Sequence, residues 1–174
     1  MKLLAFAATS SRKSINKQLV SYAAQRIENA DIEILDINDY ELPLFSEDRE
    51  AELGQPELAH KFLRKIAESD AVIISFAEHN GSYTVAYKNI FDWASRINSK
   101  VFQNKPMVML STSPGPGGAA SVLAAATNSA PYFDGDVKAS VSVPSFYDNF
   151  DMEQARITND DVNKELLNAL NTLM

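Results

Sequence analysis

The chain is organised around Asp70–Ser82, DAVIISFAEHNGS, in which an apolar run leads directly into a cluster of polar residues. Residues 71–76 are almost all apolar, which predicts a buried strand. Glu78–Ser82 then supply an acid, an imidazole, an amide, a glycine and a hydroxyl in five consecutive positions. A segment that only builds a core does not need so many hydrogen-bonding groups. The stretch therefore indicates a binding site for a ligand with several polar edges.

Strands and helices alternate on both sides of this stretch. Apolar or alternating segments predict further strands at residues 3–8, 32–34, 107–110 and 137–143. Apolar residues at helical spacing predict helices over 15–27, from Pro56, over 83–97, over 119–128 and at the end of the chain. Ser14, Ser82 and Thr158 are the expected N-caps. Tyr40–Leu53 and Pro144–Arg156 are predicted loops and candidates for subunit contacts.

The helix over residues 83–97 has two sets of large or apolar side chains. The spacing predicts that Val85, Ala86, Ile90, Ala94 and Ile97 face inward. The aromatic residues of the same helix, Tyr87, Phe91 and Trp93, are expected in the core or at a subunit interface rather than against a cofactor.

The alternation of strands and helices predicts one α/β domain over residues 1–174, with a mostly parallel sheet and helices on both faces. The first, third and fourth strands are continuously apolar, as central strands are. The second and fifth alternate with polar residues, as edge strands do. This predicts a flavodoxin-like doubly wound five-stranded sheet of order 2-1-3-4-5, whose ligands bind at the carboxyl ends of the strands, where the first and third are neighbours.

Composition excludes several classes of protein. The chain has 174 residues and a net charge of −7, which disfavours nucleic acid as a partner. It has no cysteine and only two histidines, so neither thiolate chemistry nor a metal site is expected. No apolar run approaches the ~20 residues of a membrane span. The short apolar run after Met1 is better interpreted as a strand than as a signal peptide, so we expect a cytoplasmic protein.

Three polar loops are expected to line one crevice, because they follow the three central strands: residues 9–16, 77–82 and 111–118. In the first loop, Ser10, Ser11, Arg12, Ser14 and Asn16 precede or open a helix, which is typical of an anion site. A serine-rich turn with a solvated arginine is the alternative. Neither G-x-G-x-x-G nor a Walker loop is present.

The second and third loops are each open to two interpretations. Glu78 and His79 form an acid–histidine pair that raises the possibility of a hydrolase, although G-x-S-x-G is absent. Asn80-Gly81 is typical of a tight turn. In the third loop, three glycines and two prolines favour close approach of a flat ligand, or simply a rigid connection.

At these residues the chain resembles the NADPH-dependent FMN reductase family of flavodoxin-like proteins, which also contains quinone, chromate and azo-dye reductases. The resemblance covers nearly the whole chain. The specific mark is Ala77–Ser82 running into Lys88–Arg96. The weaker marks are Ser10–Asn16, Leu42–Leu44 and Gly117-Gly118. The chain has Ala77 and His79 where the family has Pro and Tyr.

The resemblance implies FMN as cofactor and NADPH or NADH as co-substrate. It implies three groups of cofactor contacts: Ser10, Arg12, Ser14, Ile15 and Asn16 at the phosphate; Ala77, Glu78, His79, Asn80 and Gly81 along the isoalloxazine edge; and Ser111, Pro114, Gly115, Gly117 and Gly118 along its other side. It assigns no catalytic side chain, because the flavin carries the chemistry. It also implies a homodimer or homotetramer.

The leading functional hypothesis is an oxidoreductase that passes hydride from NAD(P)H through FMN to a quinone, azo compound, metal ion or free flavin. An FMN-binding electron carrier or redox-sensing module without its own NAD(P)H turnover is the alternative, and a small hydrolase ranks third. His79 is the expected determinant of substrate choice, because it would border the space where nicotinamide and acceptor stack.

Overall fold

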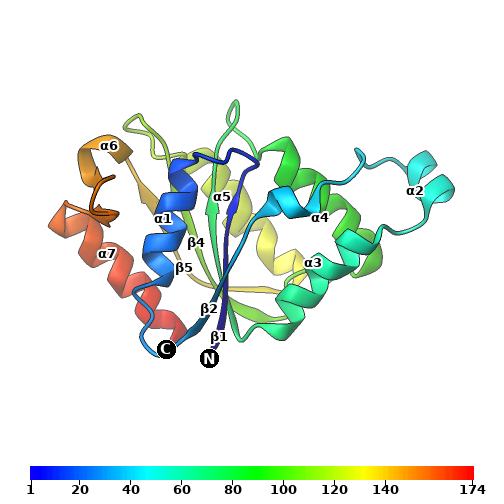
Figure 1. Ribbon diagram of the computed structural model, residues 1–174, viewed down its shortest axis with the longest axis horizontal. Coiled ribbons are helices and arrows are strands. Elements are labelled where there is room, and N and C mark those ends of the chain that lie inside the picture. Colours follow the sequence, from blue (N-terminus) through cyan, green and yellow to red (C-terminus); the bar gives the residue numbers. More distant parts are fainter.

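The computed structural model describes all 174 residues, and its centre is a five-stranded sheet of order β2-β1-β3-β4-β5 (Figure 1). Every neighbouring pair of strands in this sheet is parallel. The predicted fold class and strand order are thus confirmed. The strands are β1 (Lys2–Ala8), β2 (Asp31–Leu35), β3 (Ala71–Phe76), β4 (Lys105–Thr112) and β5 (Gly135–Val143).

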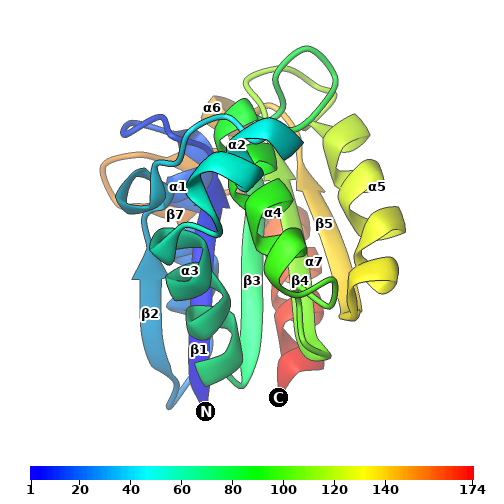
Figure 2. The same ribbon diagram turned by 90° about the vertical axis from the view of Figure 1, so that its right-hand side faces the viewer.

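Helices cover both faces of the sheet. One face carries α1 (Ile15–Ala24) and α7 (Asp160–Leu170). The other carries α3 (Glu57–Glu68), α4 (Val85–Ile97) and α5 (Ala120–Ser129), and Figure 2 looks onto it. Because side chains alternate along a strand, Leu3 and Ala5 of β1 pack under α1 and α7, whereas Leu4 and Phe6 pack on the face that α3, α4 and α5 cover. This two-sided burial explains why the central strands are continuously apolar.

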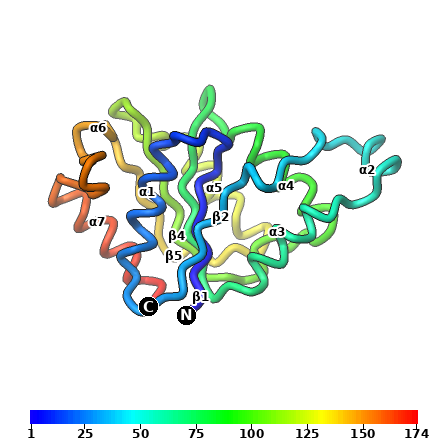
Figure 3. The backbone as a smooth tube through the Cα atoms, viewed as in Figure 1, coloured from blue at the N-terminus to red at the C-terminus, as the bar shows by residue number.

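The carboxyl ends of the strands meet at the edge of the sheet opposite the two chain termini (Figure 3). The loops after β1, β3 and β4 therefore lie together at that edge, as the strand order requires. No helix combines the length and the apolar character that crossing a membrane would require.

Two segments predicted as loops contain short regular elements. The predicted loop Tyr40–Leu53 follows a 3-10 turn, η1 (Ile37–Tyr40), and ends in an exposed helix, α2 (Glu47–Leu53). Helix α2 has no buried residue, so no apolar periodicity marks it in the sequence. The segment after β5 holds α6 (Phe146–Asn149) and the hairpin β6 (Phe150–Asp151) and β7 (Arg156–Ile157). Short 3-10 turns also follow α5 and α7: η2 (Ala130–Phe133) and η3 (Asn171–Leu173).

One predicted N-cap is confirmed and two are wrong. Ser14 caps α1, its Oγ accepting from the Asn16 N–H at 3.1 Å. Helix α4 is capped by Thr84 rather than Ser82, because Ser82 still belongs to the turn before the helix. Helix α7 is capped by Asn159, one residue after Thr158.

Apart from its first residue, helix α4 packs as predicted. Val85 is 67% exposed and does not face inward. Trp93 is fully buried and Tyr87 nearly so, which confirms their placement in the core.

Two of the marks that carried the family resemblance form one packing unit. Asn89 lies one turn before Trp93 on α4, and its amide donates to the carbonyls of Leu42 and Pro43 at 3.0 and 3.1 Å. The Trp93 indole N–H donates to the same Pro43 carbonyl at 2.7 Å. The Leu42–Leu44 segment is thereby fixed against α4, which accounts physically for the asparagine and tryptophan at this spacing.

Candidate functional site

A crevice of about 300 Å³ opens where β1, β3 and β4 end. Other cavities of the molecule have a similar volume, but this one lies at the edge that the strand order marks as a binding site. It is lined by residues of all three predicted loops and by one residue from the segment after β5: Thr9, Ser11, Lys13, Ser14, Ile15, Asn16, Ala77, Glu78, His79, Thr112, Ser113, Pro114 and Tyr147.

The Asn16 side chain bonds to two of the central strands, β3 and β4, beneath the crevice. Its Oδ1 accepts from the Ser75 hydroxyl at 2.8 Å and from the Thr112 N–H at 3.1 Å. Its Nδ2 donates to the Thr112 carbonyl at 3.1 Å. The side chain is nearly buried, and both ends of its amide are engaged. Asn16 therefore holds the first loop to β3 and β4.

The first loop presents a set of unpaired backbone donors. The N–H groups of Ser10, Arg12, Lys13 and Ile15 have no acceptor within the chain. Ile15 opens α1, so the positive end of the helix dipole adds to these donors. Arg12 is exposed and forms no ion pair, which leaves its guanidinium available. This arrangement is suited to an anion such as a phosphate.

The first turn of α1 is also tethered to the end of β2. Lys17 Nζ lies 2.6 Å from Asp36 Oδ2. This hydrogen bond with Lys17 holds the pKa of Asp36 at about 2. The ion pair fixes the helix that carries the anion-binding loop.

The second loop is a two-residue hairpin. His79 and Ser82 exchange backbone hydrogen bonds of 3.0 and 3.1 Å. Asn80 and Gly81 between them have φ values of 52° and 77°, the left-handed pair that a type I′ turn requires. The predicted tight turn is confirmed. The N–H groups of Asn80 and Gly81 have no acceptor within the chain, and the His79 side chain is exposed and unpaired.

Glu78 faces the start of α5. Its Oε2 accepts from the Val122 N–H, in the first turn of that helix, at 2.8 Å. A carboxylate there satisfies a free donor and opposes the positive end of the helix dipole. Glu78 makes no hydrogen bond to His79. No acid–histidine dyad exists, and the sequence argument for a hydrolase loses its geometric basis.

The third loop divides into residues that line the crevice and residues that build the turn. Pro114 lines the crevice, whereas Ser111, Gly115, Gly117 and Gly118 do not. Ser111 is fully buried and donates to the Gly118 carbonyl at 2.7 Å. Gly118 has a φ of 56°, and a Cβ there would lie 2.2 Å from Ser142 Oγ. The role of Gly118 in this structure is close approach to β5.

Tyr147 is the one crevice residue that lies outside the three predicted loops, whereas Thr9, Lys13, Thr112 and Ser113 belong to those loops but were not predicted as contacts. Its loop bonds to the loop after β4, because Ser145 N–H and Phe146 N–H donate to the carbonyls of Gly115 and Ser113 at 2.9 and 3.0 Å. Phe146 is fully buried, while the next residue, Tyr147, is 62% exposed. The strand order could have indicated this residue, because the carboxyl end of β5 lies at the same edge of the sheet as those of β1, β3 and β4.

Seven of the predicted cofactor contacts line the crevice: Ser14, Ile15, Asn16, Ala77, Glu78, His79 and Pro114. Ser11, predicted as part of the anion site, lines it as well. Ser10 borders an adjacent cavity beside Tyr40 and Val85. Asn80 and Gly81 form the tip of the hairpin above the crevice, and Arg12 lies on the exposed rim of the first loop.

Residues 1–147 match the family model described as NADPH-dependent FMN reductase. An NADPH:quinone oxidoreductase of Arabidopsis thaliana is 32% identical over 113 residues, which are 65% of this chain and 56% of that protein. A 2-hydroxy-1,4-benzoquinone reductase of a Burkholderia species is 35% identical over 105 residues, 60% of this chain and 56% of that protein. The chain thus spans about half the length of these curated relatives.

The fold is also shared with solved structures. That of a flavoenzyme NAD(P)H:(acceptor) oxidoreductase from Paracoccus denitrificans superposes with a TM-score of 0.81 at 24% identity, covering 99% of this chain and 94% of the other. This likeness supports the fold that the strand order predicts.

Proposed function

The chain belongs to the NADPH-dependent FMN reductase family, and from this premise we propose that it is a flavin-dependent oxidoreductase. It would bind FMN in the crevice, take hydride from NADPH or NADH, and deliver electrons to a small-molecule acceptor. The acceptor classes are a quinone, an azo compound, a metal ion or a free flavin.

The observation that carries this proposal is the set of unpaired N–H groups in the first loop, beside the available Arg12. A doubly charged phosphate fits these donors, because none of them has an acceptor within the chain and all lie in the same short loop. Ser10, Arg12, Ser14 and Ile15 would hold the phosphate. Asn16, whose amide is engaged with Ser75 and Thr112, would hold the loop in shape.

The hairpin and Pro114 would flank the isoalloxazine ring. The free N–H groups of Asn80 and Gly81 are suited to stabilise negative charge that develops at the ring edge on reduction. Glu78 would fix the hairpin against α5 rather than move a proton. When bound, FMN supplies the hydride and electron transfer itself. The protein contributes the positioning of the ring, the electrostatic environment and the space above it.

The lining of the crevice favours an enzyme over an electron carrier. Tyr147 is the only tyrosine, phenylalanine or tryptophan among the lining residues. One aromatic ring cannot cover both faces of a flat cofactor, so one face would remain open to a nicotinamide. His79, exposed beside that space, would influence which acceptor stacks there.

We further propose a cytoplasmic homodimer or homotetramer. Two exposed apolar side chains support subunit contact: Leu44 is 58% exposed and Val85 67% exposed, and both border the same two cavities. Residues 40–53, which include Leu44, were a predicted contact segment. Residues 144–156 contribute Tyr147 to the crevice. The cytoplasm is the compartment that supplies reduced nicotinamide nucleotides.

The visible absorption spectrum of the purified protein, before and after NADPH under anaerobic conditions, tests the proposal. We expect a yellow protein whose flavin bands bleach with NADPH or NADH and recover when a quinone is added. A protein that binds FMN but is bleached by neither nucleotide would be a carrier. A protein that takes up no FMN would contradict both hypotheses.

A further inference from the structure

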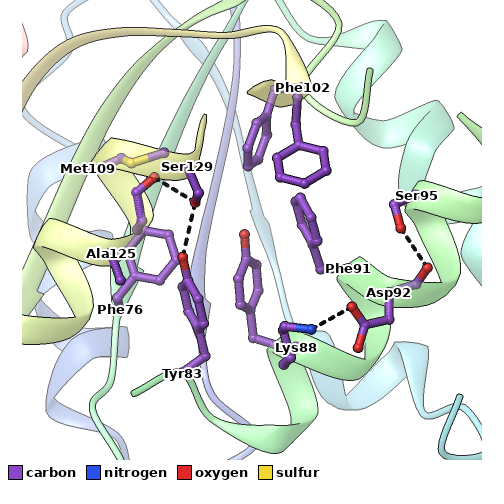
Figure 4. Close-up of a pocket in the computed structure, with 13 residues that line it drawn as sticks. Phe76, Tyr83, Lys88, Phe91, Asp92, Ser95, Phe102, Met109, Ala125 and Ser129 are labelled. Carbon is purple, nitrogen blue, oxygen red and sulfur yellow. Dashed lines mark hydrogen bonds and ion pairs between the residues drawn. The ribbon is translucent and has the colours of Figure 1, made fainter. Parts of the chain in front are cut away.

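A second cavity, of about 320 Å³, lies between α4, α5 and the sheet (Figure 4). It shares no lining residue with the crevice. Its walls come from the end of β3, from α4 with the residues before it and the loop after it, from β4, and from α5 and η2. The cavity opens to solvent between α4 and α5, where its lining residues Lys88 and Ala125 are exposed.

The walls of this cavity are mainly aromatic. Phe76, Tyr83, Tyr87, Phe91, Phe102 and Phe133 line it. Their rings already contact one another at its margins: Phe76 with Tyr87 at 5.3 Å and Phe91 with Phe133 at 4.7 Å between centroids, both edge to face. A planar aromatic molecule would extend this array, because edge-to-face and offset contacts are favourable for such rings.

One polar group in the walls has no partner. The Tyr87 side chain is 4% exposed, and its hydroxyl makes no hydrogen bond within the chain. Every fully enclosed side-chain nitrogen or oxygen atom has a hydrogen-bond partner. The Tyr87 hydroxyl has none, so it is not fully enclosed and must border the cavity that its ring lines. Burial raises the pKa of this phenol, which keeps it a neutral donor. A ligand oxygen would satisfy it.

The remaining polar groups of the cavity are already paired. The Tyr83 hydroxyl and Ser129 Oγ lie 3.2 Å apart, linking the segment before α4 to the end of α5. Lys88 and Asp92 form an ion pair of 2.7 Å. Because neither charge is left unpaired, the cavity does not select a charged ligand.

We propose that this cavity binds a neutral aromatic molecule of one or two fused rings that presents an oxygen atom to the Tyr87 hydroxyl. The volume fits, since an apolar cavity of about 150 Å³ accommodates one benzene ring. The cavity volume also lies near the lower limit for small-molecule sites, which is about 300 Å³. The site is independent of the proposed flavin chemistry, because its lining does not include any residue of the crevice.

The probe for this site is 2-naphthol, with naphthalene as the ligand that lacks the oxygen. Methionine labelled with ¹³C at its methyl group reports the location, because Met109 lines the cavity and none of the other four methionines does. We expect 2-naphthol to shift the Met109 methyl signal, assigned with Met109→Leu, in protein with or without added FMN. Binding that leaves the Met109 signal unmoved would place the probe elsewhere and overturn the proposal.

Two variants and one matched control test the mode of binding. Tyr87→Phe keeps the ring and should weaken 2-naphthol about fivefold while leaving naphthalene unchanged. Ala125→Trp, at the wall, should abolish the Met109 shift, whereas Ala124→Trp, exposed one residue earlier on α5 and outside the lining, should preserve it. Equal loss of both ligands in Tyr87→Phe, or an unchanged shift in folded Ala125→Trp, would contradict the proposal. Binding that appears only after dilution into monomers would assign the cavity to a second copy of the chain instead.

Discussion

Glu78 Oε2 accepts a 2.8 Å hydrogen bond from the Val122 N–H in the first turn of α5. The carboxylate thus joins the hairpin after β3 to a helix that follows β4. A residue that looked like one half of an acid–histidine pair is instead a helix-capping group supplied from another loop.

Glu78→Ala should destabilise the protein by about 1–2 kcal/mol, because the Val122 N–H loses its acceptor and the helix dipole loses its counter-charge. Glu78→Gln retains an acceptor oxygen and should lose less. Urea denaturation measures both. NADPH-dependent turnover per bound flavin should stay within about twofold in Glu78→Gln. A large loss of turnover in that variant alone would show that the carboxylate takes part in the chemistry.

Arg12→Ala should weaken FMN binding by about tenfold, since one charge-assisted contact to the phosphate is lost. Riboflavin, which lacks the phosphate, should bind the variant and the wild-type protein equally. Fluorescence titration of each flavin gives the dissociation constants. Lys164→Ala is the charge control, because Lys164 is an exposed cation on α7 and does not belong to the first loop. An equal loss of riboflavin affinity would mean that Arg12 shapes the loop rather than contacts the phosphate.

Thr84→Ala should cost about 1–2 kcal/mol of stability, because Thr84 Oγ1 accepts from the Tyr87 N–H and donates to the Ala8 carbonyl. Ser82→Ala should change stability by less than about 0.5 kcal/mol, since the Ser82 side chain is exposed. Chemical denaturation of the pair discriminates between the two candidate caps. Thr84→Ser, which can form both bonds, should recover most of the loss.

His79→Tyr should alter turnover with different acceptors more than it alters FMN affinity. The His79 side chain is exposed and unpaired at the crevice, so its replacement disturbs no hydrogen bond of the fold. Steady-state kinetics with a quinone and an azo dye, alongside FMN titration, gives both quantities. Loss of FMN with unchanged turnover per bound flavin would show that His79 holds the cofactor instead.

The ion pair between Lys17 and Asp36 should make stability fall at acid pH. The hydrogen bond from Lys17 lowers the pKa of Asp36 to about 2, whereas an aspartate in an unfolded chain titrates near about 3.9. Its stabilisation is therefore complete above about pH 5 and is lost as the pH falls to about 2. Both side chains are about one-third exposed, so solvent screening limits the effect to about 1 kcal/mol.

Asp36→Asn is the matched variant for this pH dependence, because it retains an acceptor for the Asn38 N–H but has no charge to titrate. Denaturation midpoints of the two proteins, measured from pH 6 to pH 2, should converge at the acid end. Parallel curves over the whole range would show that the ion pair does not stabilise the fold.

Local sequence patterns are enough to predict the architecture and the position of the crevice. Hydrophobic periodicity is a local property, so the apolar runs of β1, β3 and β4 and the alternation in β2 and β5 could be recognised without a structure. Parallel strands end at one edge of the sheet, so the strand order alone brought three polar loops together. The type I′ turn at Asn80-Gly81 followed from the same local chemistry.

The pairing of the polar groups depends on the packed chain. Asn16 with Ser75, Glu78 with Val122, and Thr84 with Ala8 join residues far apart in the chain, and no local pattern specifies such partners. The same holds for Tyr147 at the crevice and for the cavity beside Tyr87, since each depends on how separate elements pack. The fold therefore follows from short-range patterns, whereas the roles of individual side chains follow from distances that only the packed chain defines.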